Sequence, residues 1–273
     1  MFKGQCWWIT GASSGIGEAL SRALASRGAS LILSGRNVSA IEAVARDCPE
    51  ALVLPFEATD FDAIPGIVER AWSWKGRVEG LANNAGITQR SLAMETAFMV
   101  YQKIIAVDLL GPIALTQALL PKMVKAGGGR IIAISSVAGF IGAPLRSAYS
   151  AAKHGLIGYH DSVRAENEHL GIHVHVVAPG SVRTNVSKNA LAADGSVRGV
   201  SDPAIDNGML PDEAAESILG AIQEGKREIV LAKGMEFDAV ALRRKDPEAL
   251  FDLMSASIRA GYARDMGADS GQG

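Results

Sequence analysis

The stretch that most constrains the fold lies near the start of the chain, in QCWWITGASSGIGEAL. There an apolar run meets Gly11, Gly15 and Gly17, spaced G-x-x-x-G-x-G, and passes directly into a helical pattern. Gly11 permits a sharp turn after a buried strand, Gly15 lets backbone N–H groups approach a pyrophosphate, and Gly17 lets the helix pack closely on the sheet. The helix N-terminus adds the positive end of a dipole for the anion. The stretch therefore predicts a dinucleotide-binding turn.

A second pattern brings candidate catalytic side chains together. Tyr149 precedes Lys153 by four residues in a helix predicted to begin near Ser147, so both side chains lie on one face, one turn apart. An ammonium close to a phenol favours the phenolate, so Tyr149 can exchange a proton with a substrate oxygen. Ser136 ends the buried strand predicted for IIAIS, and its hydroxyl can donate to and accept from that oxygen. These residues predict carbonyl or alcohol chemistry, although the Tyr-x-x-x-Lys spacing alone also occurs on solvated helix faces.

Five motifs occur in the order found in the short-chain dehydrogenase/reductase family, which the chain resembles over residues 3–232. They are TGASSGIG at 10–17, NNAG at 83–86, Ser136, the Tyr149/Lys153 pair and PGSVRT at 179–184. The segments GPIALTQALLPKM, PLRSAY, AAKH, VRAE and NALAADGS are more narrowly similar to the branch that holds the dehydrogenase/reductase member 7 proteins. The resemblance implies a doubly wound parallel α/β sheet, the Rossmann fold, with helices on both faces and a cofactor across the crevice where the strand order reverses.

The resemblance also implies which residues bind a nicotinamide cofactor. Val182 and Thr184 would fix the nicotinamide carboxamide, and Lys153 would hold the nicotinamide ribose. Asn84 would contact the adenosine ribose, with Asn83 structural. Glu57 stands where the family usually has an Asp facing the adenine. The rest of the predicted set is Gly11, Ser13, Ser14, Gly15, Ile16, Gly17, Ala58, Ala85, Gly86, Tyr149, Pro179 and Gly180.

The polar end of the second predicted strand, SLILSGRN, bears on the choice between NAD and NADP. In an NAD-specific site an acidic residue at this strand end binds the ribose 2′-hydroxyl and repels a 2′-phosphate. This chain has Gly35 followed by Arg36. Arg36 could be a plain surface turn residue, but the missing acid and the guanidinium together favour NADP(H) over NAD(H).

The main departure from the family pattern is Asp108, where the family has the Asn of an Asn-Ser-Tyr-Lys tetrad. In the family the main-chain carbonyl at this position holds a water that links the lysine to solvent, while the Asn side chain bonds neighbouring backbone to stabilise a bend in the helix. Asp108 keeps the carbonyl and loses the amide donors. A carboxylate near Lys153 would raise the pKa of that lysine. We therefore expect Asp108 to be a tolerated variant with a part in the catalytic group of an active enzyme.

Length and composition bear on domain organisation. With 273 residues, 48% of them hydrophobic, the chain can bury the core of one α/β domain spanning residues 1–273. Residues 185–210 are small and polar with little periodicity, which predicts a mobile lid over the substrate. Residues 246–266 predict a helical extension that packs on the body or on a sister subunit, and residues 268–273 predict disorder.

Charge and cysteine content limit the kinds of partner and ligand that we expect. The 27 basic and 29 acidic residues create no strong field for nucleic acid or an anionic membrane. The two cysteines suggest no disulfide framework, and His173 and His175 lack the carboxylate or thiol company of a metal site, so no metal is predicted. No signal peptide fits, and no apolar run reaches the ~18 residues of a spanning helix. We expect a cytoplasmic protein. The long apolar helices around Val107 and Leu156, which the family pairs between subunits, predict a homodimer or homotetramer.

The predicted function is NADP(H)-dependent interconversion of a small-molecule carbonyl and a secondary alcohol. Two alternatives remain open at this point. One is an epimerase or dehydratase that uses a bound cofactor on the same scaffold. The other is a non-enzymatic, nucleotide-dependent binding or sensor protein; intact Ser136, Tyr149 and Lys153 argue against it, whereas Asp108 leaves it open.

Overall fold

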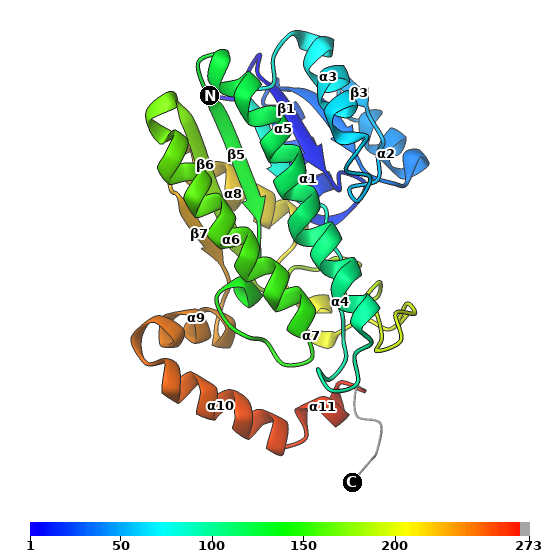
Figure 1. Cartoon of the computed structure of the whole chain (residues 1–273), viewed down its shortest axis with the longest axis vertical. Coiled ribbons are helices and arrows are strands. Elements are labelled where there is room, and N and C mark those ends of the chain that lie inside the picture. Colours follow the sequence, from blue (N-terminus) through cyan, green and yellow to red (C-terminus); the bar gives the residue numbers. More distant parts are fainter. Residues whose placement is uncertain (268–273) are drawn as a thin grey trace.

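A computed structural model describes residues 1–267, and its centre is a seven-stranded parallel sheet in the order β3-β2-β1-β4-β5-β6-β7 (Figure 1). The predicted disorder of residues 268–273 lies outside the described residues. The strand order reverses between β1 and β4, which confirms the predicted doubly wound fold and places a crevice at the carboxyl ends of these strands. The strands are β1 Cys6–Thr10, β2 Ser30–Ser34, β3 Ala51–Val53, β4 Gly80–Asn83, β5 Gly129–Ile134, β6 Ile172–Pro179 and β7 Glu228–Leu231.

Helices cover both faces of the sheet, because successive strand residues point to opposite sides and both sides are apolar. Trp7 and Ile9 of β1 pack with α1 and α8, whereas Trp8 between them packs with α3 and α5. All three side chains are fully buried. The helices are α1 Gly15–Ser26, α2 Val38–Ala45, α3 Ile64–Lys75, α4 Phe98–Ile105, α5 Gly111–Lys125, α6 Ser147–Asn167, α7 Pro203–Asp206, α8 Pro211–Gln223, α9 Met235–Lys245, α10 Pro247–Arg259 and α11 Tyr262–Asp265.

The long apolar helix predicted around Val107 is interrupted. A π-helical turn at Ala106–Leu110 separates α4 from α5, and Asp108 lies in this turn. Such turns are rare and occur frequently at functional sites. Counted through the π-helical turn, the stretch Phe98–Lys125 is also long and apolar enough to cross a membrane, contrary to our expectation, but a core helix has the same composition. Leu115 and Leu119 of this stretch are buried in the core beside the sheet.

The two residues around which we expected apolar subunit contacts are used within the subunit. Leu156 is buried against Ala133 and Val176 of the sheet, and Val107 lines the cleft described below. Leu156 is therefore not available to a partner subunit, and the oligomer expected from the helices around Val107 and Leu156 stays a prediction. The exposed apolar side chains of this helical layer are instead Phe98, Met99 and Leu110.

The C-terminal helices lie beyond the carboxyl edge of the sheet, where α9 and α10 run alongside one another (Figure 1). Leu250 of α10 is buried with Val240 of α9 and with Val137 and Ile141 from the segment after β5. The extension therefore packs on the body of the same chain. The sequence did not lead us to predict α2 or α9.

Candidate active site

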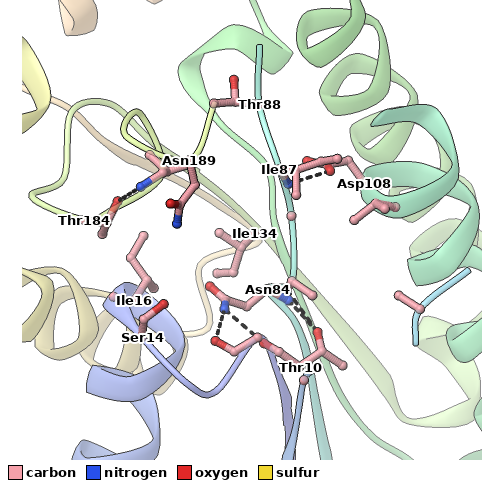
Figure 2. A pocket seen from close by; sticks show the side chains of 18 of the residues that line it. Thr10, Ser14, Ile16, Asn84, Ile87, Thr88, Asp108, Ile134, Thr184 and Asn189 are labelled. Carbon is pink, nitrogen blue, oxygen red and sulfur yellow. Dashed lines mark hydrogen bonds between the residues drawn. The ribbon is translucent and has the colours of Figure 1, made fainter. Parts of the chain in front are cut away.

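A cleft of about 1010 Å³ opens at the carboxyl ends of the central strands (Figure 2). It unites side chains from the turn after β1, the segments after β2 to β6, the π-helical turn and α6. All the predicted catalytic and cofactor residues line it except Gly17. They are Gly11, Ser13, Ser14, Gly15, Ile16, Arg36, Glu57, Ala58, Asn84, Ala85, Gly86, Asp108, Ser136, Tyr149, Lys153, Pro179, Gly180, Val182 and Thr184.

The glycine turn has the geometry that its sequence predicts. Gly11 and Gly15 have φ angles of +65° and +58°, in the left-handed region that favours glycine. At Gly17 a Cβ atom would lie 2.3 Å from the carbonyl oxygen of Gly11, so this residue serves packing behind the cleft wall. A Cβ at Gly15 would lie 2.8 Å from Cγ2 of Thr184, which shows how closely the two walls of the cleft approach here.

Helix α1 begins at this turn and offers an anion site. Its N-cap residue, Ser14, makes no side-chain capping hydrogen bond to the helix. The first N–H groups of a helix have no intrahelical partner, and they attract phosphate oxygens. Ser13, Ser14, Gly15 and Ile16 all line the cleft at this point. The residues present therefore fit the pyrophosphate of a dinucleotide.

Asn83 and Asn84, which end β4, have different structural partners. Asn83 is buried, and its Nδ2 donates to Oγ1 of Thr116 on α5 at 2.9 Å, in the structural role predicted for it. Nδ2 of Asn84 donates to the carbonyl oxygens of Thr10 at 2.9 Å and Gly11 at 3.2 Å (Figure 2). The Asn84 amide nitrogen thus supports the glycine turn, and only its oxygen is left for the predicted ribose contact.

Ser136 lies just beyond the end of β5, where it is buried at the cleft. Its Oγ accepts a hydrogen bond from the N–H of Ala138 at 3.1 Å and donates to the carbonyl of Pro179 at 3.3 Å. The hydroxyl is therefore fixed between the β5 loop and the PGSVRT segment. The neighbouring Ser135 does not share this position, because its Oγ donates to the main-chain carbonyl of Lys153 at 3.1 Å.

Lys153 and Asp108 form a buried ion pair in the cleft wall, with Nζ 3.1 Å from Oδ2. Nζ also donates to the carbonyl of Ile134 at 3.1 Å and lies 5.5 Å from the centre of the Tyr149 ring. The other carboxylate oxygen, Oδ1 of Asp108, accepts the N–H of Ile87 at 2.8 Å (Figure 2). An Asn at this position could donate hydrogen bonds through its amide. Asp108 instead accepts, from the backbone N–H of Ile87 and from the ammonium of Lys153.

Each member of this ion pair favours the charged form of the other, whereas burial disfavours the charged form of both. Burial lowers the pKa of Lys153, but the Asp108 carboxylate and the Tyr149 phenol outweigh it, so the pKa lies above its usual range. The Asp108 carboxylate thus acts on Lys153 in the direction expected from the sequence. For Asp108, burial raises the pKa against the opposing effects of the Lys153 ammonium and the Ile87 N–H. At neutral pH the ammonium is held in its charged form beside Tyr149.

Arg36 lies just beyond the end of β2 and lines the cleft. Its side chain is 67% exposed, and its Nη1 is 3.9 Å from Oε2 of Glu57, so the guanidinium is available to a ligand. The following residue, Asn37, caps α2 by accepting the N–H of Ala40. The strand end thus presents a cation to the cleft, in agreement with the sequence.

The sequence did not lead us to predict a polar cluster at the other end of the cleft. Nη2 of Arg90 donates to Oδ2 of Asp202 at 2.7 Å, and both side chains are buried. Arg146 approaches the same oxygen at 3.4 Å. Burial and the charge of Arg146 lower the pKa of Arg90 to about 10, against the opposing effect of Asp202. Three separate segments contribute these residues, so no local motif marks them.

The predicted lid, residues 185–210, is tied to the segment after β4. The N–H of Leu191 donates to the carbonyl of Thr88 at 2.8 Å, and the N–H of Arg90 donates to the carbonyl of Leu191 at 2.9 Å. The lid contains the short helix α7, whose N-cap is Asp202. Asn189 and Leu191 of this segment line the cleft, and its role as a mobile lid over the substrate stays a prediction.

Comparison with known proteins agrees with this geometry. Residues 5–195 match the family described as short chain dehydrogenase. The chain therefore belongs to the short-chain dehydrogenase/reductase family. It is 38% identical to the bovine (Bos taurus) protein named dehydrogenase/reductase SDR family member 7B, over 92% of this chain and 80% of that protein. It is 39% identical to the Drosophila melanogaster dehydrogenase/reductase SDR family protein 7-like, over 90% of this chain and 78% of that one.

Solved structures show the same fold. A short-chain dehydrogenase from Streptomyces avermitilis has a TM-score of 0.76 and 28% identity, covering 96% of this chain and all of that one (100%). A short-chain dehydrogenase from Sphingobium yanoikuyae in complex with NADPH has a TM-score of 0.75 and 25% identity, covering 90% of this chain and 95% of that one. The predicted family and its narrower branch are thus confirmed.

Proposed function

We propose that the protein is an NADP(H)-dependent oxidoreductase that interconverts a carbonyl and a secondary alcohol. The observation that carries the proposal is the shared cleft. Ser136, Tyr149 and Lys153 line the same cavity as a glycine turn and helix N-terminus that fit a pyrophosphate. A single extended ligand in this cleft can therefore contact both the phosphate-binding turn and the residues of proton transfer.

Each side chain has a defined part in the reaction. The nicotinamide, when bound, supplies or accepts the hydride. Tyr149 gives its phenolic proton to the carbonyl oxygen during reduction and takes a proton from the alcohol during oxidation. The Ser136 hydroxyl, fixed by Ala138 and Pro179, orients that oxygen. Lys153 keeps a positive charge next to Tyr149, which stabilises the phenolate left after proton transfer.

Asp108 supports this arrangement through Lys153. Its carboxylate compensates the ammonium in a place where water cannot, because both side chains are buried. Its Oδ1 also fixes the N–H of Ile87, next to the NNAG segment. The departure from the family Asn is thus compatible with an active enzyme, since it keeps Lys153 charged and positioned.

Arg36 supports NADP(H) as the cofactor. A 2′-phosphate carries charge that a planar guanidinium can bind through two hydrogen bonds, whereas a 2′-hydroxyl gains much less from it. The exposed guanidinium lies in the cleft at the strand end that bears on this choice. Among structurally similar dehydrogenases, the one from Sphingobium yanoikuyae is described in complex with NADPH and the one from Burkholderia phymatum in complex with NAD, so the proposed preference rests on Arg36.

The test is a panel of ketone substrates, comprising cyclohexanone, acetophenone, 2-decanone and 2,3-butanedione, each incubated with NADPH or NADH while nicotinamide absorbance is followed. We expect net oxidation of NADPH with at least one compound and formation of the matching alcohol. An epimerase or dehydratase would instead retain its cofactor without net turnover. Binding of NADPH with no turnover of any carbonyl or alcohol would support a sensor protein and contradict the proposal.

A further inference from the structure

Gln89 is a fully buried polar residue between the lid and the catalytic helix, with 0% of its surface exposed. Its Oε1 accepts hydrogen bonds from the N–H groups of Ala148 at 3.0 Å and Tyr149 at 3.3 Å. Its Nε2 donates to Oγ of Ser147 at 3.3 Å. One carboxamide thus contacts the first three residues of α6, and the third of them is the predicted proton donor.

These contacts amount to a helix cap supplied from another segment. The first N–H groups of a helix lack intrahelical partners, and the second and third are usually satisfied by the side chain of the N-cap residue. In α6 the N-cap residue, Arg146, makes no such bond. Gln89 takes its place at the same two positions, Ala148 and Tyr149. The backbone of Tyr149 is therefore held from outside its own helix.

The lid holds the other side of Gln89. Leu191 pairs with Gln89 as an isolated bridge, and its N–H and carbonyl bond the residues on either side of Gln89, namely Thr88 and Arg90. The Leu191 side chain is buried in one apolar cluster with Ala148 and Ala152 of α6. The lid, Gln89 and the first turn of α6 are thus packed as one unit.

A polar chain extends this unit to α4. Oγ of Ser147, which accepts from Gln89, is 2.7 Å from the hydroxyl of Tyr101. Tyr101 packs with Val100 and Ile104 of α4 against the same face of α6. A displacement of Gln89 would therefore leave the N–H groups of Ala148 and Tyr149 without this acceptor and break the link to α4. Because Gln89 and Ala148 are buried, the loss of these hydrogen bonds is costly.

We propose that Gln89 is a positioning residue, which places Tyr149 for proton transfer and couples that placement to the seating of Leu191 in the lid. This inference rests on the proposed carbonyl reduction for its kinetic consequence, but the capping contacts stand independently of it. A small displacement of a proton donor lowers the rate of proton transfer far more than it weakens ligand binding, because the rate depends on near-attack geometry.

The experiment compares Gln89→Met, which keeps side-chain length without either polar group, with Gln89→Glu, which keeps acceptor oxygens at a helix N-terminus. Gln102→Met on the exposed surface of α4 is the matched control. We expect kcat per NADPH-binding site to fall about tenfold in Gln89→Met, with KM and the Kd for NADPH within about twofold of wild type. Gln89→Glu should recover most of the lost kcat, and Gln102→Met should match wild type.

Two further measurements separate positioning from general stability. The solvent deuterium isotope effect on kcat should rise in Gln89→Met, because proton transfer becomes slower relative to the other steps. Hydrogen exchange in the peptide spanning residues 145–152 should accelerate about tenfold with or without a substrate, so it tests the cap even if the carbonyl panel gives no turnover. Wild-type kcat and isotope effect in a folded Gln89→Met, or unchanged exchange in that peptide, would overturn the proposal.

Discussion

The two ends of the cleft are built in different ways. At the cofactor end the phosphate site is formed by the main chain of one short segment, in which Gly11, Gly15 and Gly17 shape a turn that leads into α1. The substrate end consists of side chains from segments far apart in the chain, as in the contacts of Arg90 with Asp202 and of Gln89 with α6. The first end depends on backbone geometry, whereas the second depends on buried polar contacts. Substitutions at the two ends should therefore have different consequences.

The largest effect is expected at Tyr149, where the cofactor end and the substrate end of the cleft meet. Tyr149→Phe keeps the ring and removes the transferable proton, so kcat should fall ~10²- to 10⁴-fold. The Kd for NADPH should change little, because the cofactor end is intact. Stopped-flow turnover and fluorescence titration with NADPH measure the two quantities.

The matched control is Tyr159→Phe on the same helix, whose hydroxyl donates to the carbonyl of Ile113 at 3.5 Å outside the cleft. This variant should keep wild-type turnover. A Tyr149→Phe enzyme that retained most of the wild-type kcat would show that another group supplies the proton.

The second prediction tests the substrate end alone. Asp202→Asn leaves the buried Arg90 guanidinium without its counter-ion and close to Arg146, which should lower the free energy of unfolding by ~3–5 kcal/mol. Chemical denaturation measures this loss, and the Kd for NADPH of the folded protein should stay near wild type. Asp194→Asn, at an exposed aspartate of the same lid, should be near neutral.

The same ion pair predicts the direction of a pH effect. Burial raises the pKa of Asp202, but Arg90 and the other donors outweigh it, so the pKa lies below its usual value. The stability from this pair is then present above the unfolded-state pKa of ~3.9 and is lost as the pH falls through the folded-state pKa. Wild type and Asp202→Asn should therefore converge in stability on acidification, and a constant difference down to the lowest pH would contradict this assignment.

The third prediction tests the cofactor end. Arg36→Ala should weaken NADPH binding by about ten- to a hundredfold, because the guanidinium would otherwise make charge-assisted hydrogen bonds to the 2′-phosphate. NADH binding should change little. Fluorescence titration with both cofactors measures the ratio, with Arg46→Ala at the exposed end of α2 as the control. Equal losses for NADPH and NADH would mean that Arg36 serves only the local structure.

The same contrast explains what could be predicted from the sequence. Gly11, Gly15, Gly17 and the Tyr149/Lys153 pair lie in short motifs whose spacing fixes their geometry, so the fold and this part of the cleft were predictable. Gln89 was not predictable, because its role as a cap of α6 arises only when two distant segments pack together.

The π-helical turn at Asp108 escaped prediction for a related reason. The sequence there continues an apolar helical pattern, and the extra residue in the turn is stabilised by tertiary contacts of the Asp108 side chain with Ile87 and Lys153. The apolar pattern therefore predicted one long helix, and the family resemblance implied only a bend at this position. Sequence spacing also gave no indication that Arg90 and Asp202 would pair, because ion pairs between distant segments have no periodicity.

The smallest effect is expected for Asp108→Asn, which restores the family residue. Asn can still accept the N–H of Ile87 through its oxygen, so the local backbone contact survives. Its neutral side chain no longer offsets the burial of Lys153, and the pKa of Lys153 should therefore fall from its raised value. At neutral pH kcat should stay within about threefold of wild type, because loss of the carboxylate leaves Tyr149 and Ser136 in place.

The pH dependence of stability and of kcat/KM shows in which direction Asp108→Asn acts. A lysine with a raised folded-state pKa contributes stability that is present below its unfolded-state pKa of ~10.4 and is lost as the pH rises through the folded-state pKa. The raised pKa of Asp108 has the same sign at lower pH, because stability is lost as the buried carboxyl ionises on raising the pH above its unfolded-state pKa of ~3.9. In Asp108→Asn both contributions disappear, and Lys153 loses its proton at a lower pH. The alkaline limb of kcat/KM should therefore move to lower pH in the variant.

If wild type is inactive on the whole carbonyl panel while Asp108→Asn gains turnover, the native chain is a cofactor-binding protein whose carboxylate suppresses the reaction.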